Sequence, residues 1–432
     1  MSRRVLVVLF VAFVATRAVT AFLADHPEHY APPTSEVTGD PGAYEGWANQ
    51  ILWLHLNPYS EVGIEYPPGS LPFVVAPAVE KPITDTYRTR FVLLMLAVDL
   101  AGFLALLLLA RRWGSTLGPW VWVAAIPLLG PITYNRLDLV PAVATILAIE
   151  RLSARSWFGA GGWLGFGAVA KLYPALFLPI ALVASRRRQI ATGAVVVTGL
   201  FVVPYLGFLG DLTHSVFGYH TERGIQIESL WSFVLLVASK FGHAIGINYS
   251  FGALHVDSEL APAMKATSEV LSLGILGAGV WLAHRLRRSG ADASGPQVAG
   301  IMFMTMAGTM GVGTVFSPQF VLWLSALAAA VLCERGSWLT VPALTVLPIS
   351  VLTQLVYPFF YGRLIAVEPA ALVLLASRNF LVLFVGIETF LALRSRTAPE
   401  RAVEPERRSM RATGASPPPS PEATKPGAEE PA

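Results

Sequence analysis

The sequence is poor in charged residues and in cysteine. Lys, Arg, Asp and Glu make up 14% of its 432 residues, whereas a soluble globular protein carries roughly 25%. This deficit excludes disorder over most of the chain and disfavours an ordinary cytosolic enzyme. The single cysteine, Cys333, excludes a disulfide framework within the chain and a cysteine-rich metal site.

Several familiar motifs are absent as well. The chain contains no GxxxxGKS or GxxxxGKT phosphate loop, no HExxH and no GxSxG, so nothing indicates an ATP-driven pump or a metalloprotease. The net charge of +3 is typical of a membrane protein with basic cytoplasmic loops. We therefore expect membrane lipids, and no nucleic acid, among its partners.

Hydrophobic residues, in contrast, make up 54% of the chain. They fall in runs long enough to cross a hydrocarbon core of about 30 Å, which predicts an all-α polytopic membrane protein. The first run also fits a cleavable signal peptide, although Arg17 inside it favours a retained anchor. We expect about 12 transmembrane helices, near residues 5–23, 87–110, 117–134, 138–152, 157–172, 174–185, 190–209, 262–284, 298–315, 318–333, 338–358 and 369–393.

Arginine clusters between these runs orient the chain. With the clusters in the cytoplasm, both termini are cytoplasmic and two large outer loops, 25–86 and 210–262, lie outside the plasma membrane. Each loop holds an apolar stretch, 69–79 and 230–245, that predicts an interfacial helix; the second could also be a missed span. Residues 1–394 then form one transmembrane domain, and the Pro-, Ala- and Glu-rich tail 395–432 is predicted to be a disordered cytoplasmic segment.

The first outer loop offers a candidate general base. Asp40 precedes a short amphipathic helix predicted from Ala43, so its carboxylate would lie just outside the lipid, where a lipid-borne substrate presents its headgroup. There it could deprotonate a hydroxyl. Helix capping, for which Asp is a favoured residue, explains the same position.

Charged residues within or beside the predicted spans are a second group of candidates, because such groups are costly in hydrocarbon and tend to be paired or functional. Arg136 and Asp138 could pair with each other. Lys171, between a glycine-rich run and Tyr173-Pro174, suits an anionic phosphate, although a snorkelling lysine explains it too. The whole group is Arg17, Asp99, Arg136, Asp138, Lys171, Glu368, Arg378 and Glu388.

The second outer loop and two later helix ends add weaker candidates. His220 and Arg223 are three residues apart and could reach one phosphate, or simply belong to a solvated loop. Gln319 and Arg363 lie among aromatic residues that are expected at a membrane interface.

The order of these segments resembles the membrane-integral, C-type (GT-C) glycosyltransferases that use polyprenyl-phosphate sugars. The chain is most similar to the polyprenyl-phosphate-mannose-dependent mannosyltransferases, the group that contains the phosphatidylinositol-mannoside α-1,2-mannosyltransferases. The resemblance covers about residues 5–393. It is carried by Asp40 with Tyr44 and Trp47, Pro58-Tyr59, Tyr66-Pro67-Pro68, Arg136-x-Asp138, Lys171-x-Tyr173-Pro174 and Ser317-Pro318-Gln319.

The resemblance implies a GT-C-like bundle and an inverting transfer of a sugar, mannose rather than arabinofuranose, outside the cytoplasm. Asp40 matches the family's general base, with Tyr44, Tyr66, Arg136, Asp138 and Gln319 in support. The donor is a polyprenyl-phosphate sugar and the acceptor a lipid, glycolipid or other envelope hydroxyl. Cations must then stabilise the leaving phosphate, and the candidates are Lys171, His220, Arg223 and Arg363.

One departure bears on cofactors. Asp40 is followed by Pro41, so no second carboxylate completes a divalent-metal site there, although Glu45 could assist one helical turn on. We expect no cofactor, with metal dependence left open. Two other functions compete with the transferase: a secondary transporter or flippase, although no internal repeat is visible, and a membrane scaffold that docks partners through its Pro-rich tail.

Overall fold

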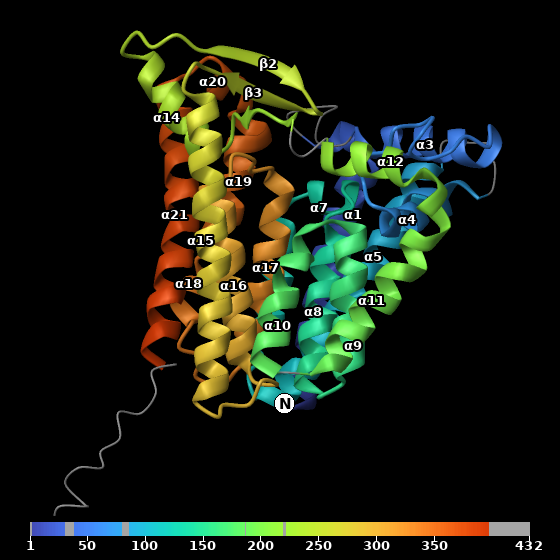
Figure 1. Cartoon of the computed structure of the whole chain (residues 1–432), viewed down its shortest axis with the longest axis vertical. Coiled ribbons are helices and arrows are strands. Elements are labelled where there is room, and N and C mark those ends of the chain that lie inside the picture. The colour runs from blue at the N-terminus through green and yellow to red at the C-terminus, as the bar shows by residue number, and fades with distance from the viewer. Residues whose placement is uncertain (1, 31–38, 80–85, 186, 219–221, 397–432) are drawn as a thin grey trace, which may run out of the picture.

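The computed structural model describes residues 2–30, 39–79, 86–185, 187–218 and 222–396. They form a bundle of helices that run between two ends of the molecule, with short helices and a small sheet gathered at one end (Figure 1). The first residues of α1 and the last turn of α21 lie at the other end (Figure 1). The prediction of a helical polytopic protein is confirmed.

Six helical segments among the described residues are long and apolar enough to cross a membrane. They are α1 (Arg3–Asp25), α5 (Tyr87–Trp113), Arg188–Gly218 beginning with α11 (Arg188–Val202), α15 (Ala261–Arg288), Thr340–Phe359 and α21 (Pro369–Arg396). Thr340–Phe359 comprises α18 (Thr340–Leu344), α19 (Val346–Gln354) and the π-helix Leu355–Phe359.

The other predicted spans are helices too, but shorter ones. At 1.5 Å per residue, the 14 residues of α9 fall short of a full crossing of about 30 Å. Proline and glycine end several of them early: Gly130 ends α6, and Pro174 follows the end of α9. These helices are α6 (Leu117–Leu129), α8 (Leu139–Ser153), α9 (Trp157–Ala170), α10 (Phe177–Ser185), α16 (Pro296–Val312) and α17 (Val321–Val331).

The two segments predicted to be outer loops fold into short elements at the same end of the bundle (Figure 1). The first contributes α3 (Asp40–Trp53) and α4 (Leu71–Val75), the latter inside the apolar stretch for which an interfacial helix was predicted. The remaining short helices are α7 (Ile132–Asn135), α12 (Leu209–Thr213), α14 (Leu230–Ser239) and α20 (Tyr361–Ile365).

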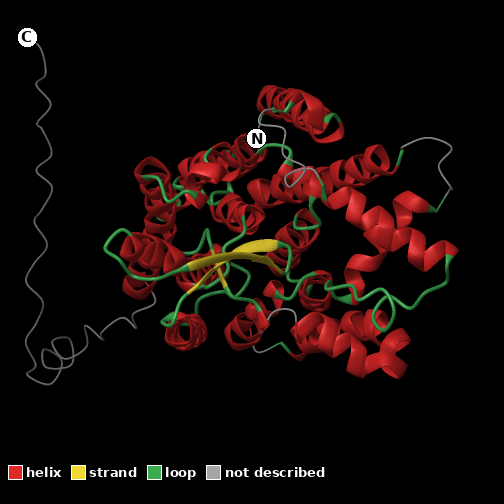
Figure 2. Ribbon diagram, turned by 90° about the horizontal axis from the view of Figure 1, so that it is seen from above, coloured by secondary structure: helices red, strands yellow, loops and turns green. Residues whose placement is uncertain are grey.

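The second outer loop also contains a sheet that the sequence analysis did not predict. Its apolar stretch forms the ten-residue α14 and no full span, and an antiparallel hairpin of β2 (Gly246–Ser250) and β3 (Ala253–Asp257) follows. Strand β3 also pairs with β1 (Ile225–Gln226), giving the order β1-β3-β2. Seen from above, the sheet lies across the end of the bundle (Figure 2).

Glycines allow two of the helices to pack with their backbones nearly touching. A Cβ atom at Gly161 of α9 would lie 2.0 Å from the carbonyl oxygen of Ile190 in α11, and one at Gly193 would lie 2.1 Å from that of Phe158. Small residues at such contacts are what membrane helices use to approach closely. This contact holds α9, the helix that ends just before Lys171, against α11.

Two of the charges found inside predicted spans pair with each other. Arg17 Nε of α1 lies 2.8 Å from Asp99 Oδ2 of α5, and both side chains are buried. Asp99 also accepts hydrogen bonds from Trp122 Nε1 at 2.7 Å and from the Tyr134 hydroxyl at 2.6 Å. The pair therefore joins α1, α5, α6 and α7 inside the bundle.

Removing one member of this pair is expected to destabilise the protein more than removing both. Asp99→Leu or Arg17→Leu alone should lower the free energy of unfolding by about 3–5 kcal/mol, because each leaves a buried charge without its partner. The double variant should recover part of that loss. Thermal unfolding of the two single variants and the double variant, purified in the same detergent, measures these losses of stability. If the loss in the double variant equals the sum of the two single losses, the two residues do not stabilise each other.

Candidate active site

Asp40 is the first residue of α3, where Gly39 occupies the N-cap position. N-capping does not account for it, because Gly39 and not Asp40 stands at the N-cap position. The carboxylate turns to other partners. Its Oδ2 lies 2.6 Å from Arg136 Nη1 and accepts a hydrogen bond of 3.2 Å from the hydroxyl of Tyr44, one helical turn on.

Arg136 reaches Asp40 from an extended residue that directly follows α7. The short helix is held on both sides, because the Tyr134 hydroxyl donates to buried Asp99 and the Asn135 side chain accepts from Arg88 at 3.4 Å. The arginine is thus positioned by the bundle beneath it. The possible pairing of Arg136 with Asp138 does not occur in the structure, where Arg136 pairs with Asp40 and Asp138 with Lys171.

Burial and charge act in opposite directions on Asp40. Burial raises the pKa of the Asp40 carboxyl, while the Arg136 guanidinium and the Tyr44 hydroxyl offset part of that rise. Tyr66 extends the network, with its hydroxyl 3.4 Å from that of Tyr44. A carboxylate of raised pKa is a stronger base, and the cation beside it favours the ionised form that can accept a proton.

Asp138 pairs with Lys171 instead of Arg136. Lys171 Nζ donates to Asp138 Oδ1 at 2.8 Å, and Asp138 is fully buried. Lys171 sits where α9 ends in extended backbone, before the turn Tyr173–Leu176 that contains Pro174. Its ammonium lies 5.3 Å from the ring centres of Tyr66 and Trp323. A lysine enclosed in this way does not snorkel to the surface.

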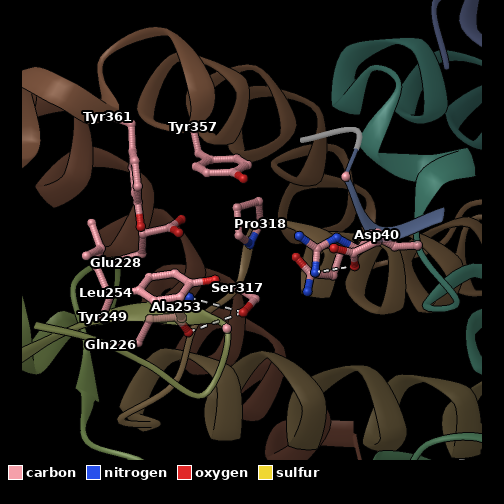
Figure 3. A pocket seen from close by; sticks show the side chains of 14 residues that line it. Asp40, Gln226, Glu228, Tyr249, Ala253, Leu254, Ser317, Pro318, Tyr357 and Tyr361 are labelled. Atoms are coloured by element: carbon pink, nitrogen blue, oxygen red, sulfur yellow. Dashed lines mark hydrogen bonds and ion pairs between the residues drawn. The ribbon is translucent and has the colours of Figure 1, made fainter. Parts of the chain in front are cut away.

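A cavity with two lobes opens around Asp40 and Arg136. Lobe 1, of about 320 Å³, and lobe 2, of about 260 Å³, share a wall made of Asp40, Arg136, Tyr249, Gly252, Ser317 and Gln319. Lobe 1 is otherwise lined chiefly by Gln226, Glu228, Ala253, Leu254, Tyr357 and Tyr361 (Figure 3). Lobe 2 is otherwise lined chiefly by Tyr44, Trp47, Tyr66, Lys171, Arg223 and Phe251.

Lobe 2 continues into an open apolar groove of about 330 Å³. Lys171, Arg223 and Phe320 line both spaces, so two cations stand at the border between polar and apolar surface. The rest of the groove is lined by Leu172, Tyr173, Leu176, Val315 and Trp323. The border is chemically suited to a molecule that carries a phosphate next to a long hydrocarbon chain.

The far wall of lobe 1 carries a second buried ion pair. Glu228 Oε2 lies 3.1 Å from Arg378 Nη1 of α21, and burial raises the pKa of the Glu228 carboxyl to about 7 in spite of that partner. Beside it, Gln226 Nε2 donates to Ser317 Oγ at 3.1 Å. Figure 3 shows Glu228 and Asp40 on opposite sides of the cavity.

The structure brings most, but not all, of the predicted site residues together. Arg363 was a candidate for binding the donor phosphate, but it lines neither lobe nor the groove. Its side chain is 60% exposed and lies 4.0 Å from Glu368. Glu45 also does not line them. His220 lies outside the described residues. The residues that line a lobe are Asp40, Tyr44, Tyr66, Arg136, Lys171, Arg223 and Gln319, while Asp138 lies behind Lys171.

Sequence reasoning missed the residues that close lobe 1. Gln226 and Glu228 stand in the same run as Arg223, but without a motif that points to them. Tyr249 reaches the cavity because it lies in the β2–β3 hairpin. The alternation of apolar and polar residues in Gly246–Ser250 and the Phe251-Gly252 turn could have indicated that hairpin. Tyr357 and Tyr361 lie at a helix end where aromatic residues were expected only as an interface belt.

No metal site is evident in the described ranges: no group of three or more His, Cys, Asp or Glu side chains is placed to hold an ion. Whether the protein needs a cofactor is not tested by this finding, and the expectation of none stays a prediction. The fold and site together define a helical membrane protein with an acidic residue, cations and an apolar groove converging at one end.

Comparison with known proteins assigns the chain to a family. The profile of glycosyltransferase family 87 matches residues 65–318, more than half of the sequence, and the protein belongs to that family. The match includes Arg136, Lys171, Arg223 and Glu228, whereas Asp40 precedes it. The transporter and scaffold alternatives lose their basis with this assignment.

Other comparisons add little to it. No curated protein matches this chain. Among solved structures, one that is similar is the crystal structure of ArnT from Cupriavidus metallidurans bound to undecaprenyl phosphate. It is 14% identical and has a TM-score of 0.44, with 96% of this chain and 82% of that chain covered. At this level of likeness, no residue correspondence follows.

Proposed function

We propose that this glycosyltransferase moves a sugar, mannose, from a polyprenyl-phosphate carrier to a hydroxyl of a glycolipid or other cell-envelope acceptor. The observation that carries the proposal is the position of Lys171 and Arg223 at the border between the polar cavity and the apolar groove. The prenyl chain lies in the groove, the phosphate meets the two cations, and the sugar extends into lobe 2 toward Asp40. The choice of mannose rests on the sequence resemblance.

The reaction is a displacement at the anomeric carbon. Asp40 accepts the proton of the acceptor hydroxyl, whose oxygen forms a bond to that carbon. The bond from the carbon to the phosphate oxygen breaks, and its electron pair leaves with the polyprenyl phosphate. Lys171 and Arg223 stabilise the charge that develops on the leaving oxygen. Attack from the side opposite the phosphate inverts the anomeric centre.

Arginine positions support a site outside the cytoplasm. Basic residues fill the last turns of α5, α15 and α21, and α15 and α21 end opposite the hairpin and α3 (Figure 1). The positive-inside rule puts that basic end in the cytoplasm. The cavity then faces the exterior, and both termini are cytoplasmic.

The role of Asp40 is tested by Asp40→Asn. With a labelled polyprenyl-phosphate mannose and membranes that supply the acceptor, this variant should release polyprenyl phosphate at least about 100-fold more slowly, because the general base is lost. Glu45→Gln, one helical turn away and outside the cavity lining, is the matched control and should keep its turnover. Wild-type turnover by the Asp40 variant would remove the base assignment.

The pH dependence of the reaction should depend on Arg136. Only the ionised Asp40 carboxylate can accept a proton, so the rate falls as the pH drops through its pKa, which burial raises. Arg136 favours the ionised form; Arg136→Gln should therefore move the acidic limb of the kcat/KM profile to higher pH. Arg363→Gln, which removes a cation away from the cavity, is the control. An acidic limb that stays in place in Arg136→Gln would contradict the coupling.

A further inference from the structure

The two lobes differ in what they can hold. Lobe 2 contains the cations that border the groove. In lobe 1, the only charged side chains among the described lining residues are Asp40, Arg136 and Glu228, and Arg136 already faces Asp40 at 2.6 Å. Lobe 1 is therefore no site for a second phosphate.

The remaining wall of lobe 1 is suited to a ring that carries hydroxyl groups. Glu228, Gln226, Ser317 and Gln319 offer carboxylate, amide and hydroxyl groups, all from residues that are almost completely buried. Aromatic faces suit the apolar side of a sugar ring, and in Figure 3 the rings of Tyr249 and Tyr357 lie on different sides of the space between Glu228 and Asp40.

The hairpin divides the two lobes at its tip. The turn residues Phe251 and Gly252 have φ angles of +50° and +67°, as in the two-residue turns that join twisted strands. A phenylalanine with positive φ is strained, and such strain is found where a side chain must be held for function. Phe251 lines lobe 2, whereas Ala253 and Leu254 line lobe 1.

The sheet connects this tip to the buried wall. Strand β3 pairs with β1 through Gln226 and His255, and with β2 through Tyr249 and Leu254. The strand that carries Gln226 leads directly to Glu228. The sheet and the residues directly after β1 therefore line part of lobe 1, while lobe 2 is lined mainly by α3 and the segments around Tyr66 and Lys171.

We infer that lobe 1 is the acceptor site, that it binds an uncharged sugar ring, and that the β2–β3 hairpin sets acceptor selectivity. The inference rests on the proposed function, since the donor must occupy lobe 2 and the groove. Asp40 lies in the wall shared by the lobes, so its carboxylate can face an acceptor hydroxyl in lobe 1 while the phosphate leaves toward Lys171.

A pair of matched variants separates the two lobes. Ala253 lines only lobe 1 and Ala43 lines only lobe 2, and neither is buried, so a tryptophan at either position narrows one lobe without disturbing the core. The purified full-length protein is given polyprenyl-phosphate mannose and one of three acceptors: octyl α-D-mannopyranoside, a serine-containing peptide, or vesicles of phosphatidylinositol. Thermal unfolding verifies that both variants are folded.

We expect transfer to the octyl mannoside. Ala253→Trp should raise the KM of this acceptor about tenfold, the equivalent of about 1.4 kcal/mol, with little change in the donor KM, and Ala43→Trp should do the reverse. If polyprenyl phosphate is released but Ala253→Trp leaves the acceptor KM unchanged, or only the peptide or phosphatidylinositol accepts, the inference is overturned and the proposed function stands. No release by the wild-type protein with any acceptor overturns both.

Discussion

The ion pair between Asp40 and Arg136 is the interaction on which the candidate site depends. It joins the first turn of α3, in one outer loop, to the extended residue after α7, and it sits in the wall between the two lobes. Burial raises the pKa of the Asp40 carboxyl, and the Arg136 cation offsets part of that rise. The pair therefore fixes where the Asp40 carboxylate lies and favours its ionised form.

The membrane-embedded part of the bundle supports this pair from below. Asp99, paired with Arg17, accepts a hydrogen bond from Tyr134, two residues before Arg136. The glycine contacts hold α9, the helix that ends just before Lys171, against α11. The buried pair Arg17–Asp99 inside the bundle thus helps to position Arg136, which faces the cavity. The two outer loops supply the rest: α3 brings Asp40, and the sheet brings Gln226 and Glu228.

The sequence predicted the helical membrane fold because apolar runs are a local property of the chain. It also pointed to Asp40, Lys171 and Arg223, since a carboxylate beside an amphipathic helix or a cation at a helix break is visible locally. The partners of these charges could not be read from the sequence: Arg136 and Asp138 could have paired with each other, but each pairs with a residue distant in the sequence. The place of the hairpin beside the cavity and the exposed position of Arg363 depend on tertiary packing, which no local pattern encodes.

In the reaction proposed here, the cations at the mouth of the groove hold the carrier phosphate within reach of Asp40. The most direct test of this arrangement is a density map of the Asp40→Asn variant with an intact polyprenyl-phosphate sugar. We expect the prenyl chain along Tyr173 and Trp323, the phosphate against Lys171 and Arg223, and the anomeric carbon facing position 40. A carrier whose phosphate sits in lobe 1, or whose chain lies outside the groove, would contradict it.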